Sequence, residues 1–398
     1  MESPLETRLD SRATTWAASV PMAGVGALFP GSGQSTPRII DLRSPAEFAD
    51  DHLPGAHNVP LFDDEGRAVV GLFYKQLSPD AAFEEARALA TRRIHGLVTR
   101  ICDLAGWDVP EADLQERLVQ CTSGGIERLE RELTVDPIDR LASNAVVLHC
   151  WRGGLRSRSV VAFLRALGFQ AAVGLEGGYK SYRKHCLGAL EAWSTPPSFA
   201  LRGLTGVGKT LVLRALCERR PEWVLDLELM AGHRSSLLGM VGLQPCSQKT
   251  FETRMFERIR DGFGGAVVME GESRRVGDAI VPPRAWEALA NATNIEITAP
   301  LEHRVRVLMD DYLADPAARG DLRCQLAKVE ARMERNVPLV EMFEAGREEA
   351  VVTELLEHYY DPLYRHSERG KRYASSVDAS DPERAAREIE AFVASAAS

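Results

Sequence analysis

The sequence has few cysteines, and no two of them are closely spaced. Its 398 residues include seven cysteines, an odd number without any C-x-x-C pair. A zinc ribbon or a disulfide framework needs closely spaced or paired cysteines, so neither is indicated. The pattern favours a reducing compartment in which one cysteine carries out chemistry, and we expect a cytoplasmic protein.

The chain also lacks a long apolar run and a large charge of one sign. Pro21 and glycines interrupt the apolar stretch from Trp16 to Phe29, which is therefore too short and broken for a membrane span. The formal net charge of −9 argues against a protein that coats nucleic acid through bulk charge. We expect no membrane partner, and a local basic groove stays compatible with this charge.

What is present is the composition of a folded chain with more than one domain. Hydrophobic residues make up 45% and charged residues 26% of the sequence, as in ordinary globular proteins. Short apolar strands alternate with helical segments in two regions, which predicts an α/β fold class with two parallel sheets. The expected parts are a leader over 1–35, a first domain over 36–192 with a helical insertion at about 92–142, a second domain over 198–300 and a helical C-terminal region over 301–398.

Local patterns place the elements within these parts. Strands are expected at Arg38–Leu42, Ala145–Leu148, Phe199–Leu201, Val224–Leu229, Ala266–Met269 and Asn294–Thr298. Residues 80–142 have apolar positions near helical spacing, which predicts helix throughout. The proline-containing stretch at 194–199 is expected to be a stiff linker between the two domains.

One cysteine stands where a strand is expected to end and a helix to begin, in His149-Cys150-Trp151-Arg152-Gly153-Gly154-Leu155-Arg156-Ser157. Two glycines let backbone N–H groups converge on one point, and the helix N-terminus, Arg152 and Arg156 add positive charge. A thiol in this cradle is favoured as the nucleophilic thiolate, and the cradle also suits an oxyanion. Catalytic roles are predicted for Cys150, Arg152 and Arg156. The alternative is that Cys150 only packs in the core.

Together with two earlier segments, this loop resembles a rhodanese domain. The earlier segments are Asp41-Leu42-Arg43-Ser44-Pro45-Ala46-Glu47-Phe48 and His52-Leu53-Pro54-Gly55-Ala56-His57-Asn58-Val59-Pro60. The resemblance implies a persulfide or perselenide on Cys150, oxyanion binding by Arg156 and the loop amides, and structural or pocket-wall roles for Asp41 and Arg43. The Cys-x5-Arg spacing resembles that of rhodanese-like phosphatases, and implies a roomier site for a phosphate-type group.

A second anion-binding loop follows an apolar strand and precedes a helical run. Gly203-Leu204-Thr205-Gly206-Val207-Gly208-Lys209-Thr210 fits G-x-x-x-x-G-K-[ST], which predicts a P-loop NTPase-like domain. The predicted phosphate-binding residues are Gly203, Gly206, Gly208, Lys209 and Thr210. The metal is left open: if Mg²⁺ binds, its ligands are Thr210 and either Glu270 or Glu272, and Glu272 could instead pair with Arg274 or Arg275.

Other polar residues of the second domain are candidates for the same site. The candidate residues are His233, Arg234, Glu270, Glu272, Arg274 and Arg275. Basic residues also recur at Arg254, Arg258, Arg304, Arg306, Arg319, Arg323, Lys328, Arg332 and Arg335. This second set is typical of a solvated, salt-bridged helix surface, and the alternative is a local groove for RNA phosphates.

From residue 36 onward the chain resembles the bacterial tRNA 2-selenouridine synthase family. The matching segments are Cys150-Trp151-Arg152-Gly153-Gly154-Leu155-Arg156-Ser157, Glu176-Gly177-Gly178-Tyr179-Lys180, Thr205-Gly206-Val207-Gly208-Lys209-Thr210, Gly232-His233-Arg234, Ser247-Gln248-Lys249 and Glu272-Ser273-Arg274-Arg275. The resemblance implies conversion of wobble 2-thiouridine in tRNA to 2-selenouridine with selenophosphate, through S-geranyl-2-thiouridine made from geranyl diphosphate. It assigns the diphosphate to Lys209 and Thr210 and the selenium step to Cys150.

The same resemblance implies the partners and cofactors. The partners are tRNA carrying 2-thiouridine and a selenophosphate-producing enzyme, and no tightly bound cofactor is expected. The alternatives are a P-loop kinase or NTPase with a regulatory rhodanese module, a Cys-x5-Arg phosphatase fused to a nucleotide sensor, and a binding-only scaffold. The insertion at about 92–142 is expected either to cover the site or to form an interaction surface.

Overall fold

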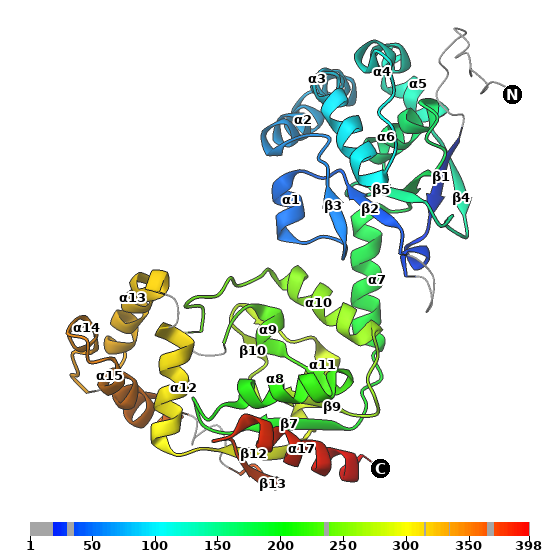
Figure 1. The fold of residues 1–398 in the computed structure, drawn as a ribbon. Helices are drawn as coiled ribbons and strands as arrows, with labels where there is room; N and C mark the ends of the chain where they lie inside the picture. Colours follow the sequence, from blue (N-terminus) through cyan, green and yellow to red (C-terminus); the bar gives the residue numbers. More distant parts are fainter. Residues whose placement is uncertain are drawn as a thin grey trace, which may run out of the picture. The chain divides into compact units, whose positions relative to one another are not determined.

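The computed structural model describes residues 19–29, 36–234, 239–313, 316–333, 335–363 and 370–397. The chain divides into two compact units, Met1–His185 and Cys186–Ser398 (Figure 1). We call them the cysteine unit and the P-loop unit. The boundary falls within helix α7 (Gly178–Ala192), earlier than the expected one after residue 192. In the second unit, the Cys186 thiol in the second half of α7 donates to the carbonyl oxygen of Glu252 at 3.6 Å.

The cysteine unit is built on a six-stranded sheet in which every pair of neighbours is parallel. The strand order is β3-β2-β5-β6-β1-β4. Strand bounds are β1 Ser19–Ala23, β2 Arg38–Asp41, β3 Ala56–Asn58, β4 Thr134–Ile138, β5 Val146–His149 and β6 Ala172–Leu175. The central strands β5 and β6 are short runs buried at every position and apolar except for His149, as expected for parallel strands covered on both faces.

The expected leader at 1–35 is wrong for residues 19–29. Val20, Met22 and Ala23 are buried in β1, which pairs with both β4 and β6, and a 3₁₀ helix, η1 (Val25–Leu28), follows. Five residues with a central proline give too short a pattern to identify a strand, and only the partners far along the chain stabilise it. The rest of the expected leader, 1–18 and 30–35, lies outside the described residues.

Helices surround this sheet, and most of the expected helical region at 80–142 is helical. Helix bounds are α1 Pro45–Asp50, α2 Asp64–Gln76, α3 Pro79–Ala105, α4 Leu114–Thr122, α5 Gly125–Glu132 and α6 Leu155–Ala166. Ser78 caps the start of α3 and Gly106 ends it in the left-handed conformation. Residues 106–113 and 139–142 are not helical, and residues 134–138 form the edge strand β4, a sheet position that tolerates Pro137.

The P-loop unit contains a five-stranded parallel sheet and a small hairpin. The sheet order is β13-β12-β7-β9-β8. Strand bounds are β7 Ser198–Arg202, β8 Val224–Leu225, β9 Val267–Glu270, β12 Thr293–Thr298 and β13 Tyr373–Asp378, with β10 Arg275–Val276 and β11 Ala279–Ile280 in the hairpin. The expected strand at Val224–Leu229 stops early, because the side chain of Asp226 accepts a hydrogen bond from the Leu229 N–H and caps a helix there.

The expected helical C-terminal region at 301–398 needs correction. Its first part is a helical cluster with a core of its own, but β13 then joins the sheet beside β12, and α17 packs against α8. The helices of this unit are α8 Lys209–Arg219, η2 Pro221–Trp223, α9 Leu227–Ala231, α10 Gln248–Arg260, α11 Pro283–Ala290, α12 Leu301–Leu313, η3 Pro316–Ala318, α13 Arg319–Glu330, α14 Leu339–Glu344, α15 Glu348–Leu355, η4 Leu356–Tyr360 and α17 Pro382–Ala396. The last segments therefore complete the P-loop unit. Within the described ranges, no helix has the length and apolar composition needed to cross a bilayer.

Candidate active site

The cysteine loop joins β5 to α6 at the carboxyl edge of the first sheet. Gly153 has a φ of +63° and Gly178 a φ of +57°, both in the region that favours glycine. A β-carbon on Gly178 would lie 2.3 Å from the carbonyl oxygen of Cys150. The Tyr179 N–H donates to that oxygen at 2.9 Å. The backbone of the Gly177–Gly178 segment therefore packs directly against the cysteine loop. This close approach leaves no space for a side chain at Gly178.

Cys150 itself is buried, and its sulfur lies at the start of α6. Its Sγ is 3.3 Å from the hydroxyl of Ser157, which is also buried. Helix α6 begins at Leu155, so its free N–H groups and positive dipole end are directed at the loop. The loop therefore has the elements of an anion site beside a nucleophile.

The two predicted arginines of this loop have different surroundings. Arg152 is exposed, whereas the Arg156 side chain is 25% exposed, and its Nη1 lies 3.5 Å from Glu47 Oε2. Arg67 of α2 approaches the same carboxylate at 3.6 Å. Glu47 is thus shared by two cations, and the sequence motif alone does not indicate Arg67 as part of this site.

Asp41 and Arg43 form a buried ion pair under the loop, 2.6 Å apart. Arg43 also donates to the carbonyl oxygen of Asp51 and lies 3.8 Å from the centre of the Tyr179 ring. Burial by itself would raise the pKa of Asp41, but His149 and the bonds from Arg43 outweigh it and lower that pKa. Burial also raises the pKa of Tyr179, whose hydroxyl donates to Asp51. This network supports the loop from inside the fold.

The P-loop lies between β7 and α8, and its predicted glycines have positive φ values that other residues rarely adopt. Gly203, Gly206 and Gly208 have φ values of +151°, +77° and +91°. A β-carbon on Gly203 would lie 2.2 Å from the carbonyl oxygen of Ile297. Lys209 donates to the carbonyl oxygens of Gly203 and Leu204 and so folds over its own loop. The predicted phosphate-binding residues therefore lie together in one loop at a helix N-terminus.

Three carboxylates stand beside the P-loop. Oxygen atoms of Glu228, Glu270 and Glu272 all lie within 4.8 Å of one another, and the Thr210 hydroxyl is 3.5 Å from Glu228. Glu270 is 1% exposed, and neither of its oxygens has a hydrogen-bond partner. Its burial, and then the charges of Glu228, Asp226 and Glu272, raise its pKa well above the ordinary value. Oxygen ligands of this kind suit a hard divalent cation such as Mg²⁺.

Glu228 is the member of this carboxylate cluster that the motif analysis misses. It lies on the short helix α9, where strand was expected, so the pattern did not align it with the end of β9. Glu228 can be assigned to the carboxylate cluster only once the sheet order is known. That order places β8 next to β9, and the Thr210 hydroxyl lies 3.5 Å from Glu228.

The other predicted polar residues are dispersed. Arg234 donates to the carbonyl oxygens of Val241 and Asp311, a structural role. His233 is half-buried against the β10–β11 turn, and burial lowers its pKa. Arg274 and Arg275 are exposed on that hairpin, and Arg275 pairs with Asp278 at 2.8 Å.

In the Ser247-Gln248-Lys249 segment, Gln248 has a structural contact. Its side-chain amide exchanges two hydrogen bonds with the backbone of Ile280, at 2.9 and 2.7 Å. It therefore ties α10 to the hairpin that carries Arg274 and Arg275.

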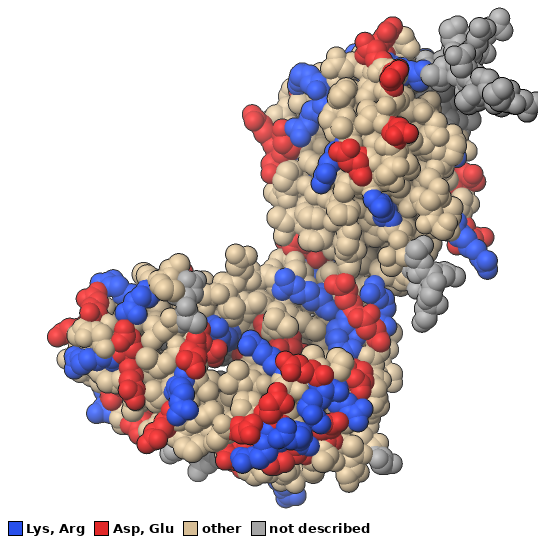
Figure 2. Space-filling model, in the orientation of Figure 1, with Lys and Arg blue, Asp and Glu red and all other residues tan. Residues whose placement is uncertain are grey.

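Most of the basic residues considered as an RNA groove have structural partners. Arg304 forms a buried pair with Asp361, and Arg258 donates to three carbonyl oxygens. Ion pairs or backbone bonds also engage Arg254, Arg319, Arg323 and Arg335. In the view of Figure 2, Lys and Arg are interspersed with Asp and Glu over the P-loop unit, without a continuous basic stripe. For these residues, the interpretation as a salt-bridged surface is favoured over a groove for RNA phosphates.

Fold and sites together define an α/β enzyme that carries a cysteine anion loop and a P-loop on one chain. The family model for the AAA domain of tRNA 2-selenouridine synthase matches residues 196–324. The tRNA 2-selenouridine synthase of Chromohalobacter salexigens is 30% identical over 357 residues, 82% of this chain and 87% of the relative. Those of Cronobacter sakazakii (30% identical, 82% and 86%) and Hydrogenovibrio crunogenus (28%, 84% and 90%) match similarly. The chain belongs to the tRNA 2-selenouridine synthase family, a family of enzymes.

Among solved structures, the N-terminal domain of a Clostridium difficile 630 protein described as ATP/GTP binding matches 41% of this chain and 97% of its own length. The identity is 22% and the TM-score 0.30. A likeness at that TM-score supports no inference about this chain.

Proposed function

We propose that this protein converts 2-thiouridine at the wobble position of tRNA to 2-selenouridine, with geranyl diphosphate and selenophosphate as co-substrates. The observation that carries the proposal is the presence of two built anion loops in one member of this family. One loop holds a buried cysteine, and the other is a P-loop beside a carboxylate cluster. A kinase or phosphatase would need only one of them.

The P-loop unit supports the first step, which is alkylation. The thiocarbonyl sulfur of 2-thiouridine attacks C1 of geranyl diphosphate, the C1–O bond breaks, and diphosphate leaves with the electron pair. The base loses its N3 proton to solvent and becomes S-geranyl-2-thiouridine. The loop amides and the Lys209 ammonium stabilise the charge that develops on the leaving diphosphate.

Mg²⁺ fits the donors beside this loop. Thr210, Glu228, Glu270 and Glu272 supply only oxygen ligands, and Glu270 is a buried carboxylate without a hydrogen-bond partner. A bound ion would add a positive charge beside the leaving diphosphate. The protein's own contribution is to hold these oxygens and Lys209 at one edge of the sheet.

The cysteine unit supports the second step, in which selenium replaces sulfur. Alkylation has turned the thiocarbonyl sulfur into a leaving group. The selenium of selenophosphate forms a bond to C2, the C2–S bond breaks, and geranylthiolate leaves with the electron pair. Water then attacks phosphorus, and the P–Se bond breaks to leave the C2=Se group and phosphate.

In that second step we assign oxyanion binding to the rhodanese-like loop. The N-terminus of α6 and Arg156 would hold the phosphate part of selenophosphate beside Cys150, which takes part in selenium transfer. Selenophosphate is reactive, so an enzyme that produces it is the expected supplier. Because tRNA is the proposed substrate, we expect the reaction to take place in the cytoplasm.

Mass spectrometry of nucleosides from 2-thiouridine tRNA tests the proposal. The protein is incubated with geranyl diphosphate, with selenophosphate, and with both. We expect S-geranyl-2-thiouridine from the first mixture and 2-selenouridine from the third. Lys209→Ala should strongly reduce the first product, and Cys150→Ala should retain it while losing the second. Unchanged nucleosides together with ATP hydrolysis would overturn the proposal in favour of a P-loop NTPase.

A further inference from the structure

The cysteine unit contains a large cavity that the two anion loops do not explain. Its volume is about 900 Å³, near the upper end of the range of roughly 300–1,000 Å³ found for small-molecule sites. Its walls come from α2, α3, α4, α5 and α6, so residues of the insertion at about 92–142 help to enclose it. An oxyanion such as selenophosphate would fill only a small part of it.

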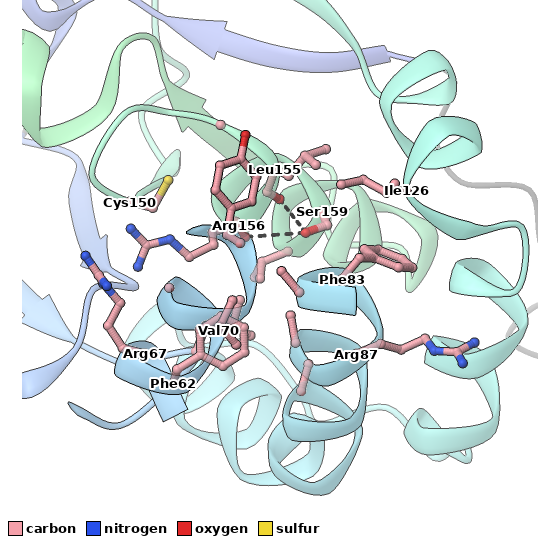
Figure 3. A pocket seen from close by; sticks show the side chains of 18 of the residues that line it. Phe62, Arg67, Val70, Phe83, Arg87, Ile126, Cys150, Leu155, Arg156 and Ser159 are labelled. Atoms are coloured by element: carbon pink, nitrogen blue, oxygen red, sulfur yellow. Dashed lines mark hydrogen bonds between the residues drawn. The ribbon is translucent and has the colours of Figure 1, made fainter. Parts of the chain in front are cut away.

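The cavity has a polar end and an apolar body. Figure 3 shows Cys150, Arg156 and Arg67 gathered on one side, with Phe83 and Ile126 on the other. The lining side chains of the body are mostly aliphatic or aromatic. They include Phe62, Val70, Ala86, Ala90, Leu118 and Leu155.

Two further basic residues line the cavity away from Cys150. Arg87 forms an ion pair with Glu84 on the same helix, and Lys75 is exposed in the last turn of α2. The charges near Cys150 are different, because Arg67 and Arg156 share the single carboxylate of Glu47 and Arg152 is exposed. The polar end therefore carries an excess of positive charge. The cavity suits a ligand with a polar or anionic head near Cys150 and an apolar tail of several carbons.

We propose that this cavity binds the ten-carbon geranyl chain during the selenium step. This inference rests on the proposed function and adds a site for the chain in the cysteine unit. With the chain among Val70, Phe83 and Ala86, the S–C2 bond lies at the polar end beside Cys150. The geranylthiolate that leaves would stay in the cavity while the base departs. The cavity thereby selects geranylated over unmodified 2-thiouridine.

The chain can reach the cavity from two sources, S-geranyl-2-thiouridine or geranyl diphosphate. Both have the same apolar tail and a polar head. One extra or missing methylene in an apolar pocket changes specificity by roughly 10- to 200-fold. The test therefore changes the space for the chain and compares the two sources.

The test fills the cavity with Ala86→Phe and uses Ala88→Phe as the matched control. Ala88 lies two residues along α3, is exposed, and does not line the cavity. Binding of the S-geranyl-2-thiouridine nucleoside is followed by the change in tryptophan fluorescence, to which Trp151 in the cavity wall contributes. We expect Ala86→Phe to weaken binding by roughly tenfold or more, while the control binds as the wild type does. Equal binding by all three proteins would overturn the proposal.

Turnover then distinguishes the sources. S-geranyl and S-methyl anticodon stem-loops are converted with selenophosphate, and geranylation from geranyl diphosphate is measured separately. If Ala86→Phe slows only the S-geranyl substrate, the chain arrives on the nucleoside. If it slows only geranylation, the chain arrives on the diphosphate, and the assignment of the cavity to the selenium step is overturned. Equal slowing of the S-methyl and S-geranyl substrates contradicts a chain site.

Two controls keep the outcome interpretable. Thermal unfolding shows whether Ala86→Phe is folded, and Ile126→Ser on α5 replaces an apolar wall residue if it is not. Nucleoside binding does not depend on turnover. Wild-type binding without any nucleoside product would support the cavity and overturn the proposed reaction. If both cavity variants form the products as the wild type does, the proposed reaction is supported and the cavity proposal is overturned.

Discussion

The two units use the same local device in different surroundings. In each, a parallel strand ends in a glycine-rich turn, and a helix begins with its free N–H groups over the turn, at α6 and at α8. Beside α6 lie a thiol, two arginines that share one carboxylate, and a large apolar cavity. Beside α8 lie a lysine, a threonine and a cluster of acids.

This difference shows that a helix N-terminus supplies anion affinity and that the neighbours determine the chemistry. An apolar wall next to the first loop suits a substrate with a lipid-like part. An acidic wall next to the second suits a divalent ion that neutralises a diphosphate. The predictions below separate the two units, beginning with the largest expected effect.

The strongest test of separate roles is complementation between two inactive variants. Lys209→Ala should reduce geranylation by roughly 100- to 1,000-fold, because it removes one stabilising cation. Cys150→Ala should stop selenation and leave geranylation intact. A mixture of the two proteins should restore 2-selenouridine, measured by nucleoside mass spectrometry, because each supplies the step that the other lacks. No recovery in the mixture would contradict a division of labour between the units.

Asp41→Asn should destabilise the cysteine unit alone. Removing one partner of the buried pair leaves Arg43 uncompensated, which costs about 3–5 kcal/mol of unfolding free energy. Hydrogen exchange followed by mass spectrometry should show faster exchange in β2 and β5 and unchanged exchange in β7 and β9. Equal loss of protection in both sheets would show that the units unfold together.

The same variant predicts a pH dependence. The folded-state pKa of Asp41 lies below its ordinary 3.8, so its stabilising contribution is present above that value and is lost as the pH falls through the folded-state pKa. The stabilities of wild type and Asp41→Asn, measured by denaturant unfolding, should therefore converge in acid. A constant difference across the pH range would contradict this account.

Glu270→Gln should remove the response of the P-loop unit to Mg²⁺. A ligand at 100 times its dissociation constant stabilises a fold by about 2.7 kcal/mol, which a melting temperature detects. We expect Mg²⁺ to raise the melting temperature of the wild type but not of the variant, while the metal-free temperatures stay close. Glu302→Gln, an exposed change on α12, is the control. A variant that responds to Mg²⁺ as the wild type does would exclude Glu270 as a ligand.

Ser157→Ala should have the smallest effect, and only in the cysteine unit. It removes a 3.3 Å contact to the Cys150 sulfur, and one such hydrogen bond contributes about 0.5–1.5 kcal/mol. Selenation should slow by up to roughly tenfold, since 1.4 kcal/mol corresponds to one power of ten, while geranylation rates stay constant. A larger loss would mean that Ser157 also positions the α6 N-terminus.

Motifs predicted the loops of both units well, because glycine positions and strand–loop–helix order are local properties. The sequence predicts Cys150, the P-loop residues and the pair Glu270 and Glu272 from their neighbours in the chain, and leaves open which of the two acids binds a metal. It does not predict Glu228, which reaches the site from α9 after a strand of only two residues. It also misses β1 and β13, whose short patterns become strands only through partners more than 70 residues away. The cavity is equally non-local, since five helices enclose it.

The position of β13 and α17 bears on how the protein is made. β13 lies beside β12, α17 packs against α8, and a β-carbon on Gly208 of the P-loop would lie 3.8 Å from Ala379. Both elements are translated more than 160 residues after the P-loop. Because domains fold as units during synthesis, a nascent chain on the ribosome would expose an incomplete P-loop until these segments emerge. The proposed geranylation activity of the P-loop unit would then appear only after translation of β13 and α17 has completed this sheet.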